Sequence, residues 1–383
     1  MTIPGHGPVP DPRPTAGGGG RGPHVHWYLP TAGDGRDIVG WAHSRTATDD
    51  PRAAGRPPDP GYLADVARAA ERLGFESVLT PTGTWCQDPW ITTAALSALT
   101  STLTFIVALR PDSIAPTLAA QMAATFQHQS GGRVALNIVT GSDEQEQRRF
   151  GDRLDHDRRY ARTAEFIEVL RGAWGDKPFD FVGEHYDVAG ATVGRPLDGP
   201  PPTVYLGGAS AAAAAVSARH ADVHLAWGEP PEAVAAQLER VRERAAALDR
   251  PPPRFGIRLH VITRDTAAAA WAEADRMLAT LDPAAIAVAR QRFEASTSVG
   301  QRRMTALTAG GADRLEVAPN LWAGFALVRR HAGTALVGSH EQVAERIAEY
   351  RALGVEHFIL SGQPHLEEAY TVGEMLLPLL RRL

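Results

Sequence analysis

The segment FGIRLHVITR, residues 255–264, combines the features that decide the fold and the site. Apolar residues occupy both alternating sets of positions, which is typical of a strand buried on both faces in a parallel sheet. Arg258 and His260 interrupt one set, and side chains two residues apart on a strand share a face. A buried cation is costly unless it is paired, so this face is predicted to meet an anion or water.

Similar apolar runs alternate along the chain with Ala-rich segments of helical periodicity, such as residues 61–74 and 230–248. Eight strand–helix units in a chain of 383 residues favour an α/β fold of the (β/α)8 TIM-barrel type over an open sheet. The predicted strands are His24–Leu29, Ser77–Thr82, Thr104–Arg110, Val134–Gly141, Thr203–Gly208, Val223–Trp227, Phe255–Ile262 and His357–Ser361.

The barrel is predicted to form one domain, residues 24–383, after a disordered Pro/Gly-rich tail at residues 1–23. A long irregular loop is expected at residues 43–61, and an insertion around residues 171–195. The segment around residues 294–338 is rich in Gly, Ser, Thr and Arg. We expect it to be a mobile lid over the active site.

Composition excludes several classes of protein. No apolar stretch is long enough for a membrane span, and the N-terminal residues lack the apolar core of a signal peptide. The single cysteine, Cys86, excludes an intrachain disulfide and a Cys-rich metal site, so a cytoplasmic location is expected. The net charge of -5 gives no general attraction to nucleic acids or membrane surfaces. The only lysine, Lys177, lies in no P-loop.

Polar residues at the predicted carboxyl ends of the strands are the candidate site. The turns VTGSD and GGAS, the second with Ser210 as a helix N-cap, either bind the phosphate of a cofactor or are tight turns that need glycine. Cys86 is either a nucleophile or a small buried thiol. His156 and Tyr160 lie one turn apart on a helix and either form its ordinary N-terminus or reach over a cofactor. No spacing typical of a metal site accompanies the histidines.

Many segments occur together in one order, among them NIVTGSD, LDHDRRY, YLGGAS, LAWGEPPE, FGIRLHVI, SVGQRRMTAL and LSGQPHLEEAY. Over residues 24–381 the chain closely resembles the FMNH2-dependent alkanesulfonate monooxygenases of the bacterial luciferase-like superfamily. The resemblance implies a TIM barrel that uses FMN, as FMNH2 from a separate NAD(P)H-dependent FMN reductase. It also implies O2-dependent cleavage of an organosulfonate to sulfite and an aldehyde for sulfur assimilation, and a homo-oligomer, a tetramer in several members.

The resemblance also implies site residues, each matched by motif. It assigns Cys86, Arg258, His260, Arg303 of the lid and Tyr370 to the active site, and Thr140, His156, Tyr160, Ser210 and Trp227 to FMN. Arginine pairs well with the oxygens of a permanent anion such as a sulfonate. A lid arginine would exclude water from the site. Cys86 then lines the site rather than forming a covalent bond.

Four departures from the family pattern leave the substrate open. The loop after the first strand is longer, Trp85 replaces a small polar residue, Arg330 and His331 replace a usual Gly-Gly pair, and Gln363 replaces an aromatic residue. The alternatives are a methanesulfonate or sulfone monooxygenase, another luciferase-like oxidoreductase that uses flavin or the deazaflavin F420, or a barrel that only binds flavin.

Overall fold

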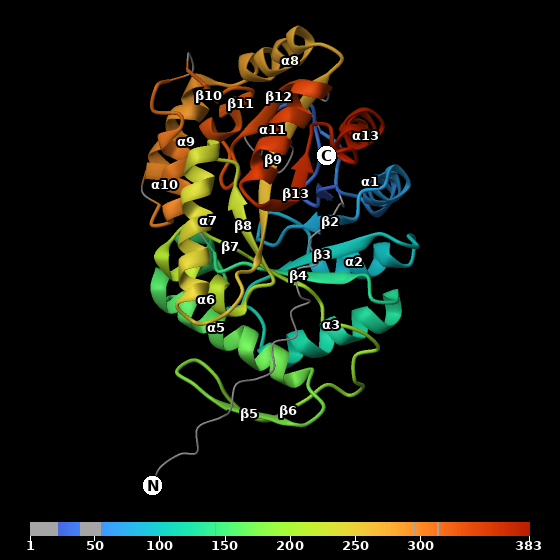
Figure 1. The fold of residues 1–383 in the computed structure, drawn as a ribbon, viewed down its shortest axis with the longest axis vertical. Helices are drawn as coiled ribbons and strands as arrows, with labels where there is room; N and C mark the ends of the chain where they lie inside the picture. Colours follow the sequence, from blue (N-terminus) through green and yellow to red (C-terminus); the bar gives the residue numbers. More distant parts are fainter. Residues whose placement is uncertain (1–21, 39–54, 142, 295, 312–313) are drawn as a thin grey trace.

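Eight parallel strands close into a barrel in the computed structural model of the chain (Figure 1). Strand β9 pairs with both β8 and β13, and β13 pairs with β1, so the ring is continuous. The predicted barrel is therefore confirmed. The structure describes residues 22–38, 55–141, 143–294, 296–311 and 314–383, so residues 1–21 of the predicted tail and residues 43–54 of the predicted loop lie outside the described residues. The barrel strands are β1 (His24–Tyr28), β2 (Ser77–Thr80), β3 (Thr104–Leu109), β4 (Val134–Ile138), β7 (Val204–Gly207), β8 (Val223–Trp227), β9 (Arg254–Arg264) and β13 (Val355–Ser361).

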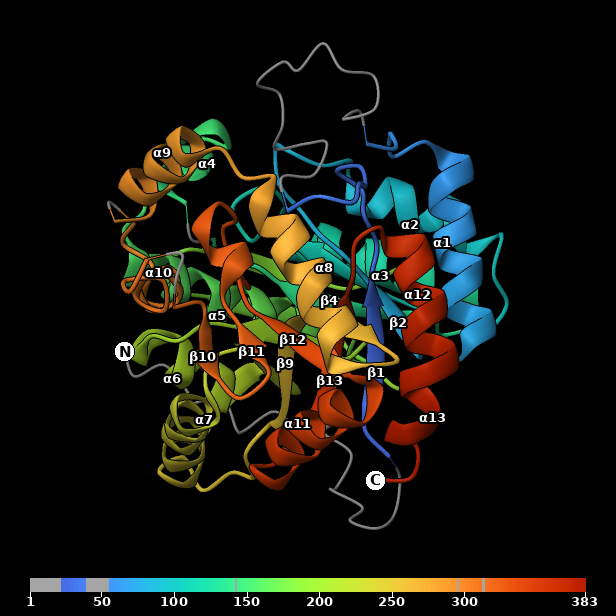
Figure 2. The same cartoon turned by 90° about the horizontal axis from the view of Figure 1, so that it is seen from above.

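Helices connect the strands and surround the barrel (Figure 2). The first begins where the Asp59 carboxylate accepts a hydrogen bond from the Tyr62 N–H at 2.9 Å, and it ends at Gly74. No helix in the described ranges is both long and apolar enough to cross a membrane. The surrounding helices are α1 (Pro60–Leu73), α2 (Pro89–Ser97), α3 (Pro116–Ser130), α5 (His156–Ala173), α6 (Ala211–His220), α7 (Pro231–Ala246), α11 (His340–Ala352) and α12 (His365–Thr371), which continues through the π-helix η2 (Val372–Leu376) to α13 (Leu377–Leu380).

Two insertions interrupt the regular alternation of strands and helices. The first forms an antiparallel hairpin, β5 (Phe179–Val182) and β6 (Asp187–Ala191). The second contains three strands that the sequence did not predict, β10, β11 and β12. Of these, β12 pairs in parallel with the far half of β9, which extends past the barrel. The mobility of this lid stays a prediction. The second insertion and its flanks are α8 (Ala267–Ala279), α9 (Pro283–Glu294), α10 (Val299–Ala306), β10 (Glu316–Ala318), β11 (Leu321–Trp322), η1 (Gly324–Leu327) and β12 (Ala335–Ser339).

Residues that face outward from the barrel, such as Trp27, pack under the helices in the main core. The barrel interior has three layers along the strands: histidines near the amino ends, an apolar layer in the middle and polar residues at the carboxyl ends. Inside, an apolar layer in the middle includes Leu79, Ile106 and Ile359, with Tyr28 packed against it. This layer separates the amino ends of the strands from the carboxyl ends, where enzymes of this fold carry their sites. We call it the apolar plug: Leu79, Ile106, Ala135, Tyr205, Val223, Leu225 and Ile359.

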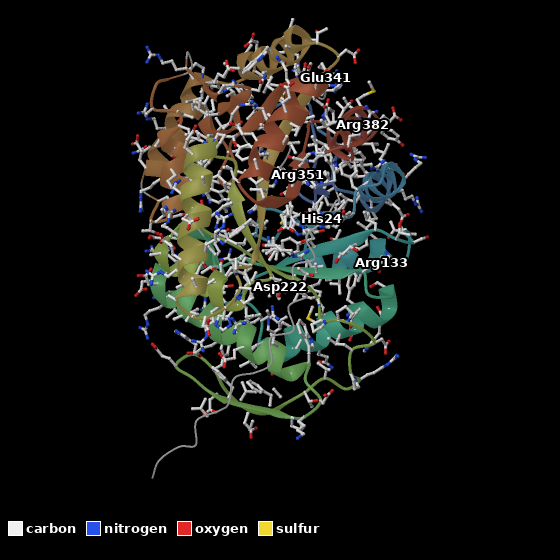
Figure 3. The ribbon with its side chains drawn as sticks, in the orientation of Figure 1. His24, Arg133, Asp222, Glu341, Arg351 and Arg382 are labelled. Carbon is white, nitrogen blue, oxygen red and sulfur yellow. The ribbon has the colours of Figure 1, made fainter. Side chains whose placement is uncertain are left out.

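Histidines fill the barrel on the amino-terminal side of the plug. The His26 and His357 rings stack at 5.3 Å, and their Nε2 and Nδ1 atoms lie 3.0 Å apart in a hydrogen bond. Ser77 contacts His26 at 2.7 Å, and the His24 ring, labelled in Figure 3, stacks on His357 at 4.6 Å. Burial lowers the pKa of His26 to about 4 and that of His357 well below its usual value, so both rings are neutral at pH 7.

This layer predicts acid-sensitive folding. Since the folded pKa of His26 lies below its unfolded value, its contribution is complete above about pH 6.5 and is lost as the pH falls towards 4. For His26 alone the loss is on the order of 3 kcal/mol at the acid end. Urea unfolding between pH 7 and pH 4 measures it. The His26→Gln variant should show a shallower fall in unfolding free energy, whereas an equal slope in both proteins would refute the assignment.

Candidate active site

Arg258 and His260 lie on the inner face of β9 at the carboxyl end of the barrel. The Arg258 Nη2 donates to the Ser361 Oγ at 2.8 Å, and the same hydroxyl lies 2.7 Å from the His260 Nδ1. The Arg258 guanidinium also lies over the Tyr28 ring at 4.8 Å. The structure thus brings together the two residues that the strand pattern placed on one face, and joins them through a hydroxyl of β13.

A second guanidinium, missed by the sequence reasoning, lies beside this group. The Arg329 Nε donates to the Ile38 carbonyl at 2.5 Å, and its Nη1 donates to the Gln363 amide oxygen at 3.2 Å. Its guanidinium is 5.3 Å from the Phe325 ring centre. The only sequence signal was its position beside Arg330 and His331, which already departed from the family pattern.

Both guanidinium groups are charged, and only Arg329 feels a nearby carboxylate, that of Asp34, among the residues that the structure describes. Burial lowers the pKa of Arg258 and of Arg329 to about 10, and for Arg258 the nearby Arg329 adds to the decrease. Both therefore remain protonated at pH 7. Within the described ranges neither arginine forms an ion pair with a carboxylate. His260 adds no charge, because burial lowers its pKa well below the usual value. The mouth of the barrel therefore presents two positive charges to a ligand.

Cys86 lies in the loop after β2, close enough to Tyr28 to act on the pKa of its phenol. Its Sγ is 3.6 Å from the Pro81 and Gly83 carbonyl oxygens. Burial raises the pKa of this thiol to about 12, so it stays protonated at pH 7 and is a poor nucleophile. This fits a residue that lines the site without forming a covalent bond.

We therefore expect the Cys86→Ser variant to keep kcat within about threefold of the parent, because no thiolate is formed to lose. The steady-state rate with saturating substrate measures this. A loss of 100-fold or more in a folded variant would show that the sulfur takes part in the chemistry.

Residues from helix α5 and from the loops after β4 and β7 meet in a second polar group, beside the end of β7. The Tyr160 hydroxyl donates to the Gly207 carbonyl at 3.4 Å and is hydrogen-bonded to Ser210 and Thr140. Burial raises its pKa to about 12. Gly208 has φ +149°, and a Cβ there would collide with this hydroxyl. Because Gly208 has no Cβ, the Tyr160 hydroxyl can lie against the backbone just before α6. The N-terminus of a helix, with its free N–H groups, suits a phosphate.

Two further predicted cofactor residues adjoin this group or the lid. The His156 ring lies 5.0 Å from the Tyr160 ring. Trp227 ends β8, packs beside Gly300 of α10, and meets the His331 ring edge-on at 5.9 Å. Thus Thr140, His156, Tyr160 and Ser210 gather in one place, whereas Trp227 lies against the lid.

Two predicted residues are placed elsewhere. Arg303 is on α10, where its Nε donates to the Glu229 Oε2 at 2.6 Å rather than facing Arg258. Tyr370 is on the outer face of α12, with its hydroxyl against Arg72 and that guanidinium 5.4 Å from its ring. Since the inner face of α12 is formed by His365, Glu368 and Ala369, the helix directs Tyr370 away from the barrel mouth.

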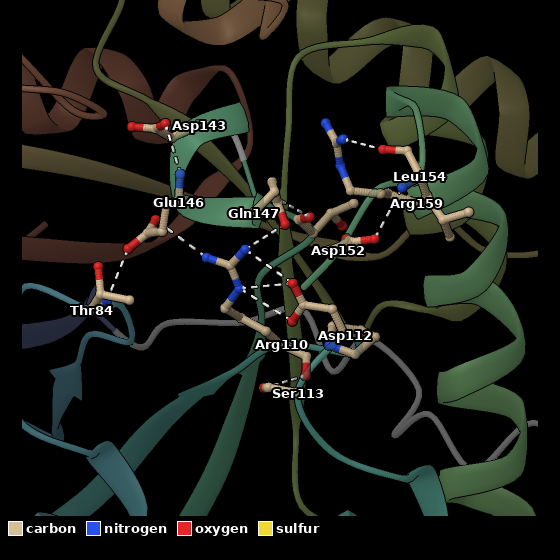
Figure 4. A network of polar contacts seen from close by, with 12 residues as sticks. Thr84, Arg110, Asp112, Ser113, Asp143, Glu146, Gln147, Asp152, Leu154 and Arg159 are labelled. Carbon is tan, nitrogen blue, oxygen red and sulfur yellow. Dashed lines mark hydrogen bonds and ion pairs between the residues drawn. The ribbon is translucent and has the colours of Figure 1, made fainter. Parts of the chain in front are cut away.

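A buried network holds the loops around the site (Figure 4). Arg110, at the end of β3, pairs with Asp112 at 3.1 Å and with Glu146 of helix α4 (Glu144–Arg149) at 3.2 Å. The Glu146 carboxylate also accepts from the Thr84 N–H at 3.1 Å. The network joins the loops after three neighbouring strands, including the one that carries Cys86.

The lid contacts the same region. Arg330 forms an ion pair with Asp143, and the Arg292 Nη2 of α9 donates to the Gln145 Oε1 at 3.1 Å. Figure 2 shows α9 beside α4. The insertion therefore spans the site from the Arg329 side to the loop after β4.

A buried Asp–His pair, also missed by the sequence reasoning, supports the β13 side. The Asp34 carboxylate accepts from the His365 Nδ1 at 2.7 Å and from the His365 N–H at 2.6 Å, and it contacts the Tyr62 hydroxyl. Although burial alone raises the pKa of Asp34, the His365 charge and these hydrogen bonds lower it below its usual value. The pair anchors the start of α12, and the His365 ring lies 5.7 Å from Tyr28.

The fold and site define a TIM barrel whose carboxyl end carries two groups. One is the cationic mouth, with Arg258 and Arg329. The other is the polar group of Thr140, Tyr160, Gly208 and Ser210, which we call the cradle. The model of the luciferase-like monooxygenase family matches residues 39–357, so the chain belongs to this family. A riboflavin lyase solved with modified FMN and riboflavin has a TM-score of 0.76 at 19% identity, covering 94% of this chain and 92% of that one. The EDTA monooxygenase of Chelativorans sp. BNC1 has a TM-score of 0.73 at 20% identity, and the match covers 94% of each chain. An F420-dependent secondary alcohol dehydrogenase has a TM-score of 0.67 at 16% identity, and the match covers 94% of this chain and 99% of that one. At these identities the similar structures support the fold alone.

Proposed function

We propose that the protein is a two-component monooxygenase that uses reduced FMN and O2 to cleave the C–S bond of an organosulfonate, releasing sulfite and an aldehyde. The observation that carries the proposal is the pair of charged guanidinium groups, Arg258 and Arg329, without carboxylate partners among the described residues. A sulfonate is an anion at every working pH, and it fits two arginines that remain charged.

The cradle at the end of β7 fits FMN. Gly208 lets the Tyr160 hydroxyl approach the backbone, and the Tyr160 and Ser210 hydroxyls with Thr140 offer hydrogen bonds to phosphate oxygens. His156 lies at its edge, and Trp227 offers an aromatic wall for the ring system. Reduced FMN, when bound, supplies the electrons that activate O2.

The chain's residues then divide the remaining work. Arg258 and Arg329 bind and orient the sulfonate, Ser361 holds Arg258, and neutral His260 offers a polar ring without a charge that would compete for the anion. Cys86 and Tyr28 line the pocket. The lid helix α10, held through Arg303 and Glu229, covers Trp227 and excludes water.

Reduced flavin has to come from outside, and we propose that a separate NAD(P)H-dependent FMN reductase supplies it. We propose in addition that the chain forms a homo-oligomer. Mixing experiments with a reductase and sedimentation of the isolated protein address these two proposals separately.

The test is a panel of alkanesulfonates from methyl to decyl, with FMN, a reductase, NADPH and air, and sulfite as the product measured. We expect sulfite that depends on each component. Replacing FMN by reduced F420 separates the two cofactor classes, since the proposal expects binding of reduced FMN and no sulfite with F420. Methanesulfonate as the only substrate would favour the narrower alternative.

A further inference from the structure

Tyr28 is the last residue of β1, and its side chain faces into the barrel on top of the apolar plug. The Arg258 guanidinium covers its ring at 4.8 Å, and the His365 ring approaches at 5.7 Å. The charges of Arg258 and Arg329 both act on its phenol. The tyrosine therefore lies at the centre of the cationic mouth, although no sequence motif singled it out.

Its hydroxyl differs from every other tyrosine hydroxyl in the chain. Among the residues that the structure describes, the Tyr28 hydroxyl has no hydrogen-bond partner, whereas the other six tyrosines each contact one. Their partners are Asp34 for Tyr62, the Gly207 carbonyl for Tyr160, the Pro111 carbonyl for Tyr186, His357 for Tyr205, the Glu229 carbonyl for Tyr350 and Arg72 for Tyr370. Tyr28 is half-buried at the carboxyl end of its strand. A hydroxyl there without a protein partner is free to hydrogen-bond a ligand that enters the mouth.

The phenol is a donor at every working pH. Burial raises the pKa of Tyr28 above its usual value, and this effect outweighs the opposite influence of the two arginines. The ring cannot accept a proton, so towards an anion it offers one O–H. With Arg258 and Arg329 it completes three donors from three parts of the chain.

We propose that Tyr28 is a specificity residue that donates a hydrogen bond to the third oxygen of a bound sulfonate, so that the pocket prefers a sulfonate to a carboxylate. The inference rests on the proposed function. A sulfonate has three oxygens arranged as a tripod, while a carboxylate has two in a plane. Two guanidinium groups can bind two oxygens of either anion. Only the sulfonate then has a third oxygen that can accept a hydrogen bond from a phenol.

The experiment compares dissociation constants of octanesulfonate and nonanoate, which share an eight-carbon chain, with the protein loaded with reduced FMN under anaerobic conditions. Each is measured by titration of the intrinsic fluorescence, for the parent, Tyr28→Phe and Tyr205→Phe. Tyr205 is the matched control, since its hydroxyl contacts His357 on the other side of the barrel interior.

The parent is expected to bind octanesulfonate at least tenfold more tightly than nonanoate. Tyr28→Phe should weaken octanesulfonate about tenfold, the loss of one charge-assisted hydrogen bond, and change nonanoate by less than twofold. Tyr205→Phe should leave the ratio unchanged.

Equal weakening of both ligands in Tyr28→Phe would overturn the inference, because packing alone would then explain the residue. An unchanged octanesulfonate constant would overturn it as well. A parent protein that binds neither anion would instead contradict the proposed function. The flavin dissociation constant and the circular dichroism of each variant confirm that it is folded.

Discussion

Replacing Arg258 by methionine is expected to lower kcat/KM for an alkanesulfonate about 100-fold, equivalent to about 3 kcal/mol. Methionine keeps most of the apolar stem and removes the charge that faces the anion. The reason is geometric, since Arg258 is held by Ser361 on a rigid strand and has no acidic residue to pair with among the described ones. Steady-state sulfite release measures the effect.

The Arg258→Met variant should also be at least as stable as the parent. The charge of Arg329 disfavours the charged form of Arg258 in the free enzyme, because it lowers the pKa of Arg258. Removing one charge relieves this repulsion, so the unfolding temperature should be unchanged or higher. Arg264→Met, at the end of the same strand and paired with Glu368 at 2.9 Å, is the control and should retain turnover. Full activity of Arg258→Met would remove Arg258 from the substrate site.

The Gly208→Ala variant is expected to weaken FMN binding by at least tenfold. An alanine at φ +149° is strained, and its Cβ would displace the Tyr160 hydroxyl from the cradle. Since Tyr160 also contacts Ser210 and Thr140, the whole phosphate position is disturbed. Quenching of flavin fluorescence gives the dissociation constant.

Gly132→Ala is the matched control for backbone strain. Gly132 has φ +89°, but nothing lies within 4 Å of its added Cβ, and it precedes β4 at the opposite end of the barrel from the cradle. We expect it to lower stability and leave FMN affinity within twofold. An FMN constant for Gly208→Ala that equals the parent value would place the phosphate elsewhere.

The strand pattern was sufficient for the barrel but not for its extension. Buried parallel strands are apolar on both faces, so their positions stand out in the sequence. Strand β12 did not stand out, because it lies within an insertion and pairs with the far half of β9 rather than closing the ring. Closure itself depends on the pairing of β9 with β8 and β13, which no single segment encodes.

Site residues could be predicted where the alternation of side chains along a strand determines their direction. Those in the loops and the lid could be predicted less well. Arg258 and His260 follow from alternation on one strand. Arg329 lies in an irregular segment whose path depends on contacts with Ile38 and Gln363, far away in the sequence. Motif matching suggested Arg303 and Tyr370, but a helix orients each residue by its own buried face, and these faces direct them to Glu229 and Arg72.

The proposed role of the paired arginines, binding a sulfonate for oxidative cleavage, can be measured in a single turnover. Anaerobic protein with one equivalent of FMNH2 and octanesulfonate is mixed with O2, and sulfite is counted per flavin oxidised. Sulfite should approach one per flavin in the parent, whereas the Arg258→Met, Arg329→Met double variant should oxidise flavin without releasing sulfite. Flavin oxidation without sulfite in the parent, for every chain length from methyl to decyl, would contradict it.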